Sequence, residues 1–223
     1  MRVGVVPRGG EPYDRGMAPA TEQRRHVLER ITRGISERAG GTASFHVAID
    51  GPDAAGKTTF ARDLDDVLYP MLPEGAELRR FSADDLIIPL VLRRSEEAAD
   101  PRWVYENVYP LDRIREITIG DPAHERPGTV VLVDGMSLLR PELEDLWHLR
   151  IYLSVPESVT VERVLARLNE EDDEPEAVRA RYQERYLPAL RLYREIVDPV
   201  SRSEVVIDMH DPDSPVVVRW GGL

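Results

Sequence analysis

Short apolar segments alternate along the chain with longer amphipathic ones. The clearest apolar run is 129–134 (TVVLVD), and 45–50 (FHVAID) and 149–155 (LRIYLSV) have the same character. Runs of this length that are rich in Val, Ile and Leu are typical of buried parallel strands. The pattern also predicts weaker strands at residues 77–81, 204–207 and 216–219.

Helical periodicity fills much of the sequence between these runs. In 21–38, Val27, Leu28, Ile31 and Ile35 share one face, as in an amphipathic helix. Further helices are expected at about 58–68, 157–169 and 175–196. Strands that alternate with helices predict an α/β fold, with a central parallel sheet covered by helices on both faces.

The domain organisation follows from where this pattern begins. Residues 1–20 contain several Gly and Pro and no periodicity, so we expect a loosely ordered arm. No linker divides 21–223, which we take as a single domain. The stretch 86–128 is the hardest to interpret, because an apolar run, an acidic patch and an aromatic cluster follow one another without a regular period.

Composition removes several classes of function. The 223 residues include no cysteine, which excludes disulfides, thiol catalysis and cysteine-bound metals. The net charge of −12 argues against general nucleic-acid binding, which requires neutralisation of phosphates. The sequence has neither a long apolar run nor a secretory signal, so we expect a cytoplasmic protein without a membrane partner. The sequence does not decide whether the protein forms a homo-oligomer.

Residues 51–58 (GPDAAGKT) match the phosphate-loop pattern G-x-x-x-x-G-K-[ST] after a predicted strand and before a predicted helix. Such a loop turns backbone N–H groups toward phosphate oxygens, its Lys reaches the β- and γ-phosphates, and its Ser or Thr hydroxyl binds Mg²⁺. Lys57 is the only lysine in the chain. The predicted nucleotide-binding residues are Gly51, Asp53, Ala54, Ala55, Gly56, Lys57, Thr58 and Thr59.

The absence of a second lysine excludes the guanine-reading N-K-x-D motif of GTPases. The remaining interpretation is a P-loop NTPase fold with a helical lid at about 157–185, as in small kinases. Arg163 and Arg167 lie one helical turn apart, where they would neutralise a transferring phosphoryl group or simply face solvent. The roles of Arg179, Arg181 and Arg185 stay open.

Two aspartates follow predicted strands at the edge where α/β proteins bind ligands. Asp84 comes after 77–81, a strand expected to lie next to the phosphate loop, and would accept the proton of an acceptor hydroxyl or cap the next helix. Asp134 would bind Mg²⁺ together with Thr58, or cap a helix. Tyr105, Asn107 and Tyr109 would bind an acceptor or belong to the core.

The ordered set of motifs resembles the uridine kinase-like branch of P-loop kinases, which includes phosphoribulokinase. The matching pieces are the loop 48–59, Ser82-Ala83-Asp84, the stretch 131–143, and Arg185-Tyr186-Leu187-Pro188. The resemblance implies ATP or another NTP with Mg²⁺, with Asp84 as base, Asp134 linked to the metal, and Arg163 and Arg167 in the lid. The family's aromatic after the base is replaced, since Asp84 is followed by Asp85-Leu86-Ile87, and Asn107 is the nearest match to the family's ribose-binding aspartate.

These features predict a phosphotransferase that moves the γ-phosphoryl group to a hydroxyl of a small metabolite, with a uridine- or cytidine-like nucleoside as the first candidate. The differences from the family pattern lie in the region expected to bind the acceptor. A sugar, a pantothenate-like compound or a specialised metabolite is therefore an alternative acceptor. A nucleoside monophosphate kinase would need no base. A nucleotide-binding regulator without catalysis is the last alternative.

Overall fold

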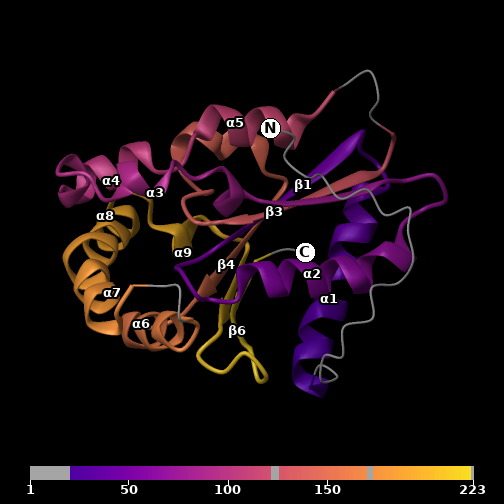
Figure 1. Ribbon diagram of the computed structural model, residues 1–223. Coiled ribbons are helices and arrows are strands. Elements are labelled where there is room, and N and C mark those ends of the chain that lie inside the picture. The colour runs from indigo at the N-terminus through magenta and orange to yellow at the C-terminus, as the bar shows by residue number, and fades with distance from the viewer. Residues whose placement is uncertain (1–20, 122–125, 170–172, 222–223) are drawn as a thin grey trace.

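Six strands form one sheet in the order β2-β3-β1-β4-β5-β6, in which only β6 is antiparallel to its neighbour (Figure 1). The computed structural model describes residues 21–121, 126–169 and 173–221. The predicted arm 1–20 lies outside them. The strands are β1 Ser44–Asp50, β2 Leu78–Ser82, β3 Thr129–Gly135, β4 Leu149–Ser154, β5 Val205–Asp208 and β6 Val216–Trp220. The α/β prediction and all six predicted strands are confirmed.

Nine α-helices surround this sheet within the described residues (Figure 1). They are α1 Glu22–Ala39, α2 Lys57–Leu68, α3 Leu90–Arg93, α4 Pro101–Asn107, α5 Leu111–Ile119, α6 Glu157–Leu165, α7 Pro175–Arg181, α8 Leu187–Val197 and α9 Pro199–Arg202. A π-helical turn, Tyr182–Tyr186, joins α7 to α8, so the predicted helix 175–196 is one continuous element with a π insertion. Such insertions are frequent at functional sites.

The strand order corrects one expectation. We expected the strand before Asp84 to lie beside the strand that leads into the phosphate loop, but β3 lies between them. β3 is buried along its whole length, and its unbroken apolar character suits an interior strand of a parallel sheet. Its register places Asp134 opposite both Ile49 of β1 and Ser82 of β2.

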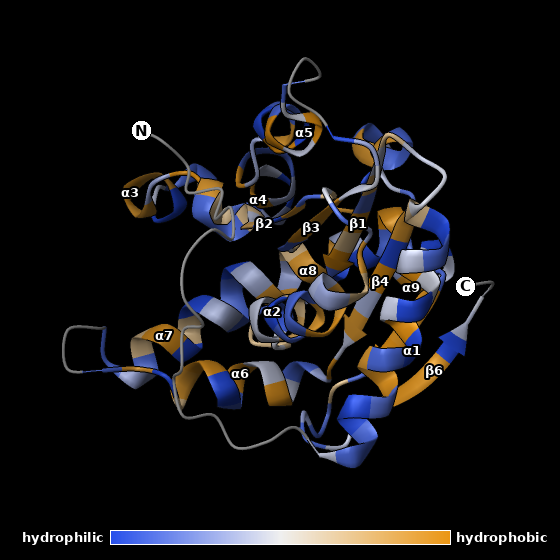
Figure 2. Ribbon diagram, turned by 90° about the vertical axis from the view of Figure 1, so that its right-hand side faces the viewer, coloured by the Kyte–Doolittle hydropathy of each residue, from blue (hydrophilic) through white to orange (hydrophobic). Residues whose placement is uncertain are grey.

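The sheet has a hydrophobic core on each face. On one face, Ile31 of α1 and Phe60 of α2 are fully buried. On the other face, Ile114 of α5 and Leu190 of α8 pack with residues of β3. The strands β1, β3 and β4 are largely orange, hence apolar, in Figure 2. Helices α3, α4, α6, α7 and α8 gather at one end of the molecule, on the left in Figure 1.

None of the helices in the described ranges is both long enough and apolar enough to cross a membrane.

Asp50, at the carboxyl end of β1, ties the sheet to α8 and to the turn after β3. Its carboxylate is fully buried and accepts hydrogen bonds from Tyr193 Oη (2.5 Å), the Leu139 N–H (3.1 Å) and the Gly51 N–H (2.6 Å). Burial raises the pKa of Asp50 to about 6, from an ordinary value of 3.8, although the hydrogen bonds and Lys57 lower it. The folded protein therefore holds this proton more tightly than the unfolded chain does.

This raised pKa predicts a pH dependence of stability. Between about pH 4 and pH 6 the folded state binds more protons, so the contribution of Asp50 to the free energy of unfolding falls by about 3 kcal/mol as pH rises, and is flat above pH 6. Urea titrations of the wild type and Asp50→Asn across pH 4–7 should show a stability difference that changes through this window.

Asp112→Asn, at an exposed aspartate on α5, is the control for loss of a carboxylate. Tyr193→Phe removes a hydrogen bond that lowers the Asp50 pKa. In this variant the free energy of unfolding should therefore continue to fall with rising pH above pH 6. If the free energies of unfolding of the wild type and Asp50→Asn differ by the same amount at every pH, the raised pKa of Asp50 is contradicted.

Candidate active site

The phosphate-loop residues Gly51–Thr58 connect β1 to α2 at the carboxyl edge of the sheet. Gly56 caps α2 with φ of 87°, a left-handed conformation that glycine adopts without strain. A Cβ on Gly51 would lie 2.5 Å from the Leu153 carbonyl oxygen, so only glycine lets the loop start this close to β4. The structure thus requires glycine at the two positions for different reasons: a left-handed backbone at Gly56 and a close approach to β4 at Gly51.

Lys57 begins α2 and is 5% exposed. Its Nζ donates to the Pro52 carbonyl oxygen at 3.0 Å, inside the loop. The ammonium group therefore lies in the concave side of the backbone turn that the motif forms. A phosphate in this turn would meet both the Lys57 charge and the N-terminus of α2.

Asp134 lies between the phosphate loop and β2. Its Oδ2 accepts from Thr58 Oγ1 (2.7 Å) and Ser82 Oγ (2.9 Å). Its Oδ1 is buried and has no hydrogen-bond partner within the described part of the chain. Burial raises the pKa of Asp134, while the bonds from Thr58 and Ser82 oppose that effect.

These oxygens fit Mg²⁺. A hydroxyl and a carboxylate with an unpaired, buried oxygen are the hard ligands that Mg²⁺ prefers, together with phosphate oxygens and water. The described residues contain no cluster of three or more His, Cys, Asp or Glu side chains able to bind a metal by themselves. The predicted pair Thr58 and Asp134 would therefore hold Mg²⁺ jointly with a nucleotide.

Asp84 lies in a short 3-10 turn, Ala83–Leu86, directly after β2. A Cβ on Gly135 would come within 2.6 Å of the Ala83 Cβ, so the glycine at the end of β3 lets this turn pack closely. Asp84 Oδ1 accepts from Tyr109 Oη at 2.8 Å. Burial raises the pKa of Tyr109 well above its ordinary value of 10.0, which keeps its hydroxyl a neutral donor.

A cavity of about 200 Å³ lies between this edge of the sheet and the helices α4, α6 and α8. Asp84 and Tyr109, two of the residues predicted to bind an acceptor, line it, and so does Asp53 of the phosphate loop. Its lining consists of Asp53, Asp84, Ile87, Arg93, Val104, Val108, Tyr109, Met136, Thr160, Tyr182, Tyr186, Leu187 and Leu190.

Two side chains connect the predicted lid to the phosphate loop. Tyr182 of the π-helical turn donates to Asp53 Oδ2 at 2.9 Å. Arg163 of α6 donates to the carbonyl oxygens of Ala54 (3.2 Å), Met209 (2.8 Å) and His210 (3.0 Å). Arg163 thus contacts the backbone of the loop.

Several predicted residues lie elsewhere. Asn107 is exposed, and its Nδ2 donates to the Trp103 carbonyl oxygen of its own helix at 2.8 Å. The Tyr105 ring lies under the Arg140 guanidinium at 4.2 Å and does not line the cavity. Arg167 and Thr59 are exposed.

Two of the later arginines contact residues outside the phosphate loop. Arg181 pairs with Asp173 at 2.6 Å, and Arg185 donates to the Ser95 carbonyl oxygen at 2.9 Å.

Sequence reasoning missed three cavity residues, Arg93, Thr160 and Tyr182. Arg93 ends the apolar run that we could not interpret, Thr160 lies in a predicted helix, and Tyr182 lies in the predicted lid. A polar residue within an apolar period was the only signal, and it does not distinguish a cavity wall from a solvated face.

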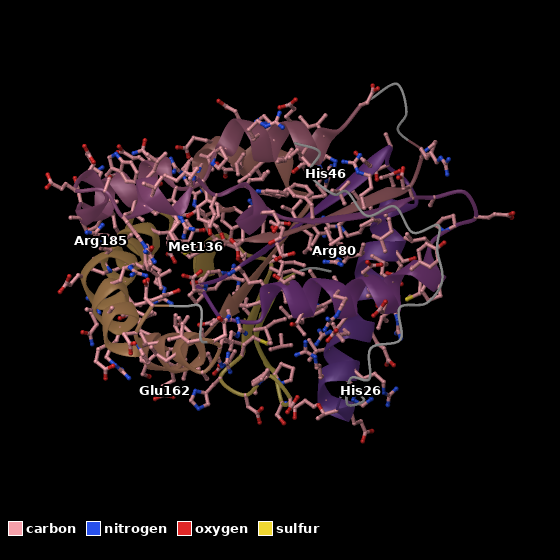
Figure 3. The ribbon with its side chains drawn as sticks, in the orientation of Figure 1. His26, His46, Arg80, Met136, Glu162 and Arg185 are labelled. Atoms are coloured by element: carbon pink, nitrogen blue, oxygen red, sulfur yellow. The ribbon has the colours of Figure 1, made fainter. Side chains whose placement is uncertain are left out.

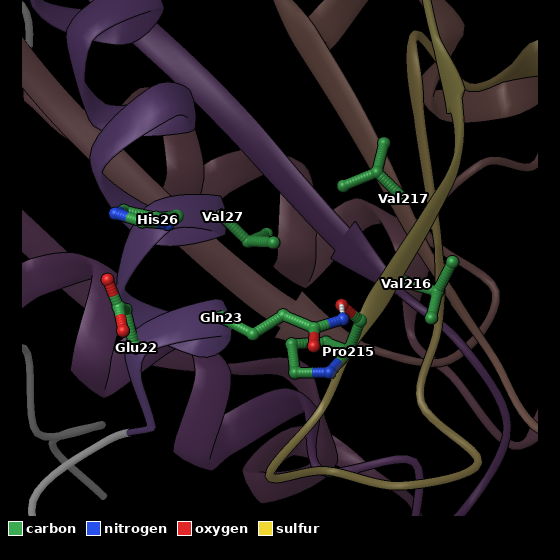
Figure 4. Close-up of a pocket in the computed structure, with 7 residues that line it drawn as sticks. All are labelled: Glu22, Gln23, His26, Val27, Pro215, Val216 and Val217. Carbon is green, nitrogen blue, oxygen red and sulfur yellow. Dashed lines mark hydrogen bonds between the residues drawn. The ribbon is translucent and has the colours of Figure 1, made fainter.

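A second, open groove of about 530 Å³ lies between α1 and β6 (Figure 4). His26 and Val216 line it, and Gln23 Nε2 donates across it to the Pro215 carbonyl oxygen at 3.0 Å. Figure 3 shows His26 at the opposite end of the molecule from Arg185, while Met136, which lines the smaller cavity, lies toward the Arg185 end. The groove contains no phosphate-loop residue, so we place the site at the smaller cavity.

Neither a protein-family model nor a curated protein matches the chain. Solved structures do resemble it. A provisionally assigned fructose transport system kinase from Silicibacter sp. TM1040 is 20% identical, with a TM-score of 0.57 over 81% of this chain and 95% of that one. A possible uridine kinase from Bacillus stearothermophilus is 18% identical, with a TM-score of 0.54 over 82% and 97%. At such identities the likeness concerns the fold: the chain has the α/β fold of the P-loop kinases.

Proposed function

We propose that this protein is a kinase that moves the γ-phosphoryl group of ATP, or of another nucleoside triphosphate, to a hydroxyl of a small metabolite. One observation carries the proposal. A carboxylate, Asp84, lies on the wall of a cavity at the same sheet edge as Lys57, Thr58 and Asp134. This is the arrangement that phosphoryl transfer to an alcohol needs: a phosphate cradle, metal ligands and a proton acceptor.

In the proposed reaction the acceptor oxygen attacks the γ-phosphorus. The bond from that phosphorus to the β,γ-bridging oxygen breaks, ADP leaves, and the acceptor proton passes to the Asp84 carboxylate. Tyr109 holds Asp84 Oδ1 and so fixes the orientation of the carboxylate. Lys57 and the loop N–H groups bind the phosphates.

Thr58 and Asp134 would hold Mg²⁺, which neutralises phosphate charge when bound. Arg163 and Tyr182 act in this scheme as positioning residues, because they join α6 and the π-helical turn to the phosphate loop. A direct catalytic role for Arg163 and Arg167 stays a prediction.

A non-nucleoside acceptor is favoured by two features of the site. Asn107, the residue closest to the family's ribose ligand, points its amide at its own helix. The cavity wall is mostly aliphatic and aromatic. Uridine and fructose, which the names of the two similar structures suggest, nevertheless belong in any acceptor screen.

Asp84→Asn tests the base. Loss of the proton acceptor should lower kcat by about 10²- to 10⁴-fold and leave the affinity for Mg-ATP nearly unchanged, because the hydrogen bond described for Asp84 comes from Tyr109 and not from the phosphate loop. Coupled ADP release measures the first quantity and titration calorimetry the second. Asp85→Asn, an exposed neighbour in the same turn, is the matched control. A fully active Asp84→Asn variant would exclude Asp84 as the base and favour a nucleoside monophosphate kinase.

Asp134→Asn tests the metal assignment. Addition of Mg²⁺ should strengthen ATP binding to the wild type, and this gain should shrink by about 10- to 100-fold in the variant, the usual cost of losing a group that orients or binds a metal. ATP affinity with and without Mg²⁺ is the measurement, with exposed Asp112→Asn as the control. An equal gain in all three proteins would place the metal elsewhere.

A further inference from the structure

The acceptor cavity combines an apolar wall with a few fixed polar groups, and this combination restricts what fits it. Six of its described lining residues are aliphatic or Met, namely Ile87, Val104, Val108, Met136, Leu187 and Leu190. Its volume of about 200 Å³ is below the usual range for ligand pockets. A small occupant with an apolar body is the natural match. The choice of occupant rests on the kinase activity proposed above.

Thr160 of α6 belongs to this wall, and its hydroxyl is buried. The residue is 1% exposed, and its Oγ1 has no hydrogen-bond partner in the part of the chain that the structure describes. A helical Thr usually directs its hydroxyl to the carbonyl three or four residues earlier. Here the Pro156 carbonyl oxygen accepts only the Thr160 N–H, at 3.0 Å. A buried hydroxyl without a partner is costly, so it points to a bound molecule that satisfies it.

Arg93 is the one cation among the described cavity residues. Its Nε donates to the Ile88 carbonyl oxygen at 3.1 Å, which fixes one edge of the guanidinium. The two carboxylates of the wall each accept a tyrosine hydroxyl, Asp84 from Tyr109 and Asp53 from Tyr182. None of the ion pairs among the described residues involves Arg93.

We infer that the phosphoryl acceptor is a small hydroxy acid with a branched or otherwise apolar body. Its reacting hydroxyl lies at Asp84, its carboxylate binds the guanidinium of Arg93, and Thr160 Oγ1 forms a hydrogen bond with one of its polar atoms. Arg93 and Thr160 are thus specificity-determining residues.

Polyhydroxylated acceptors suit this wall poorly. A sugar or a ribose carries hydroxyls on several sides, and against aliphatic side chains most of them would lose their hydrogen bonds to water without replacement. A hydroxy acid needs few polar partners, and its charged end gains a strong, charge-assisted hydrogen bond. Discrimination against a neutral analogue should be large, because the analogue would leave the partly buried Arg93 guanidinium without a carboxylate partner.

The first experiment compares matched acceptors with Mg-ATP. The probes are 3-hydroxyisobutyrate with longer branched homologues, the neutral counterpart 2-methyl-1,3-propanediol, and uridine and fructose as polyhydroxylated compounds. Each is followed by ADP release and by calorimetric binding in the presence of Mg-ADP. We expect at least one acid to be phosphorylated with a kcat/KM about 100-fold or more above that of its neutral counterpart.

Three variants then assign the contacts. Arg93→Gln should raise the KM of the acid strongly, abolish the preference over the neutral alcohol and leave the KM of ATP within about twofold. Thr160→Val keeps the shape of the side chain and should raise the acceptor KM about tenfold while the melting temperature stays the same or rises, because no hydrogen bond within the protein is lost. Thr32→Val is the matched control: Thr32 is buried in α1, and its Oγ1 donates to the Glu29 carbonyl oxygen at 3.1 Å, so this variant should lower the melting temperature without changing the acceptor KM.

The outcomes separate this inference from the proposed function. Phosphorylation of uridine or fructose in preference to every acid would overturn the inference and support the kinase. An Arg93→Gln variant that weakens ATP binding instead of acceptor binding would also overturn it, because Arg93 would then serve the nucleotide. Acids that neither bind nor react would overturn it as well. ATP binding without transfer to any compound would count against the kinase itself.

Discussion

The parallel pairing of β3 with both β1 and β2 determines where every group of the candidate site lies. Because all three strands end at the same edge, the phosphate loop that follows β1 and the turn that follows β2 flank the end of β3. Asp134 stands in register with the last residues of both neighbours. A slip of one residue would turn its carboxylate to the other face of the sheet and separate it from Thr58 and Ser82.

The edge of the sheet is also where the protein holds its buried polar groups. Asp50, Asp134 and Lys57 are each nearly or fully buried within a few residues of a strand end. Charged groups in such positions are costly unless they are paired, and here backbone N–H groups, hydroxyls and a carbonyl oxygen supply the partners. The exception is Asp134 Oδ1, whose unmet bonding capacity fits a metal ligand.

Two side chains join the predicted lid to the phosphate loop. Tyr182 donates to Asp53, and Arg163 donates to the Ala54 carbonyl oxygen. A lid attached in this way can respond to nucleotide binding. The π-helical turn places Tyr182 and Tyr186 in the same cavity wall.

Much of this organisation is visible in the sequence, for identifiable reasons. The loop 51–58 and the strands around it have strict local patterns, and the register of parallel strands then carries Asp134 and Asp84 to the same edge. The position of β2 was predicted wrongly because strand order depends on long connections that have no local signal.

The acceptor side was less predictable. Asn107 and Tyr109 stand two residues apart, yet one is exposed and bonds to its own helix while the other reaches Asp84. Which side of a short helix faces a cavity depends on the packing of α4 against α8. Thr160 and Arg93 line the cavity together with residues that are distant in the sequence, so no local pattern identifies them as cavity residues.

The most direct test of the account is phosphorus NMR of the products formed from Mg-ATP and the panel of hydroxyl compounds. The account predicts ADP together with a new phosphate monoester whose formation requires the added acceptor and is lost in Asp84→Asn. Formation of a diphosphate from a nucleoside monophosphate, of inorganic phosphate alone, or of no product despite bound ATP would contradict it.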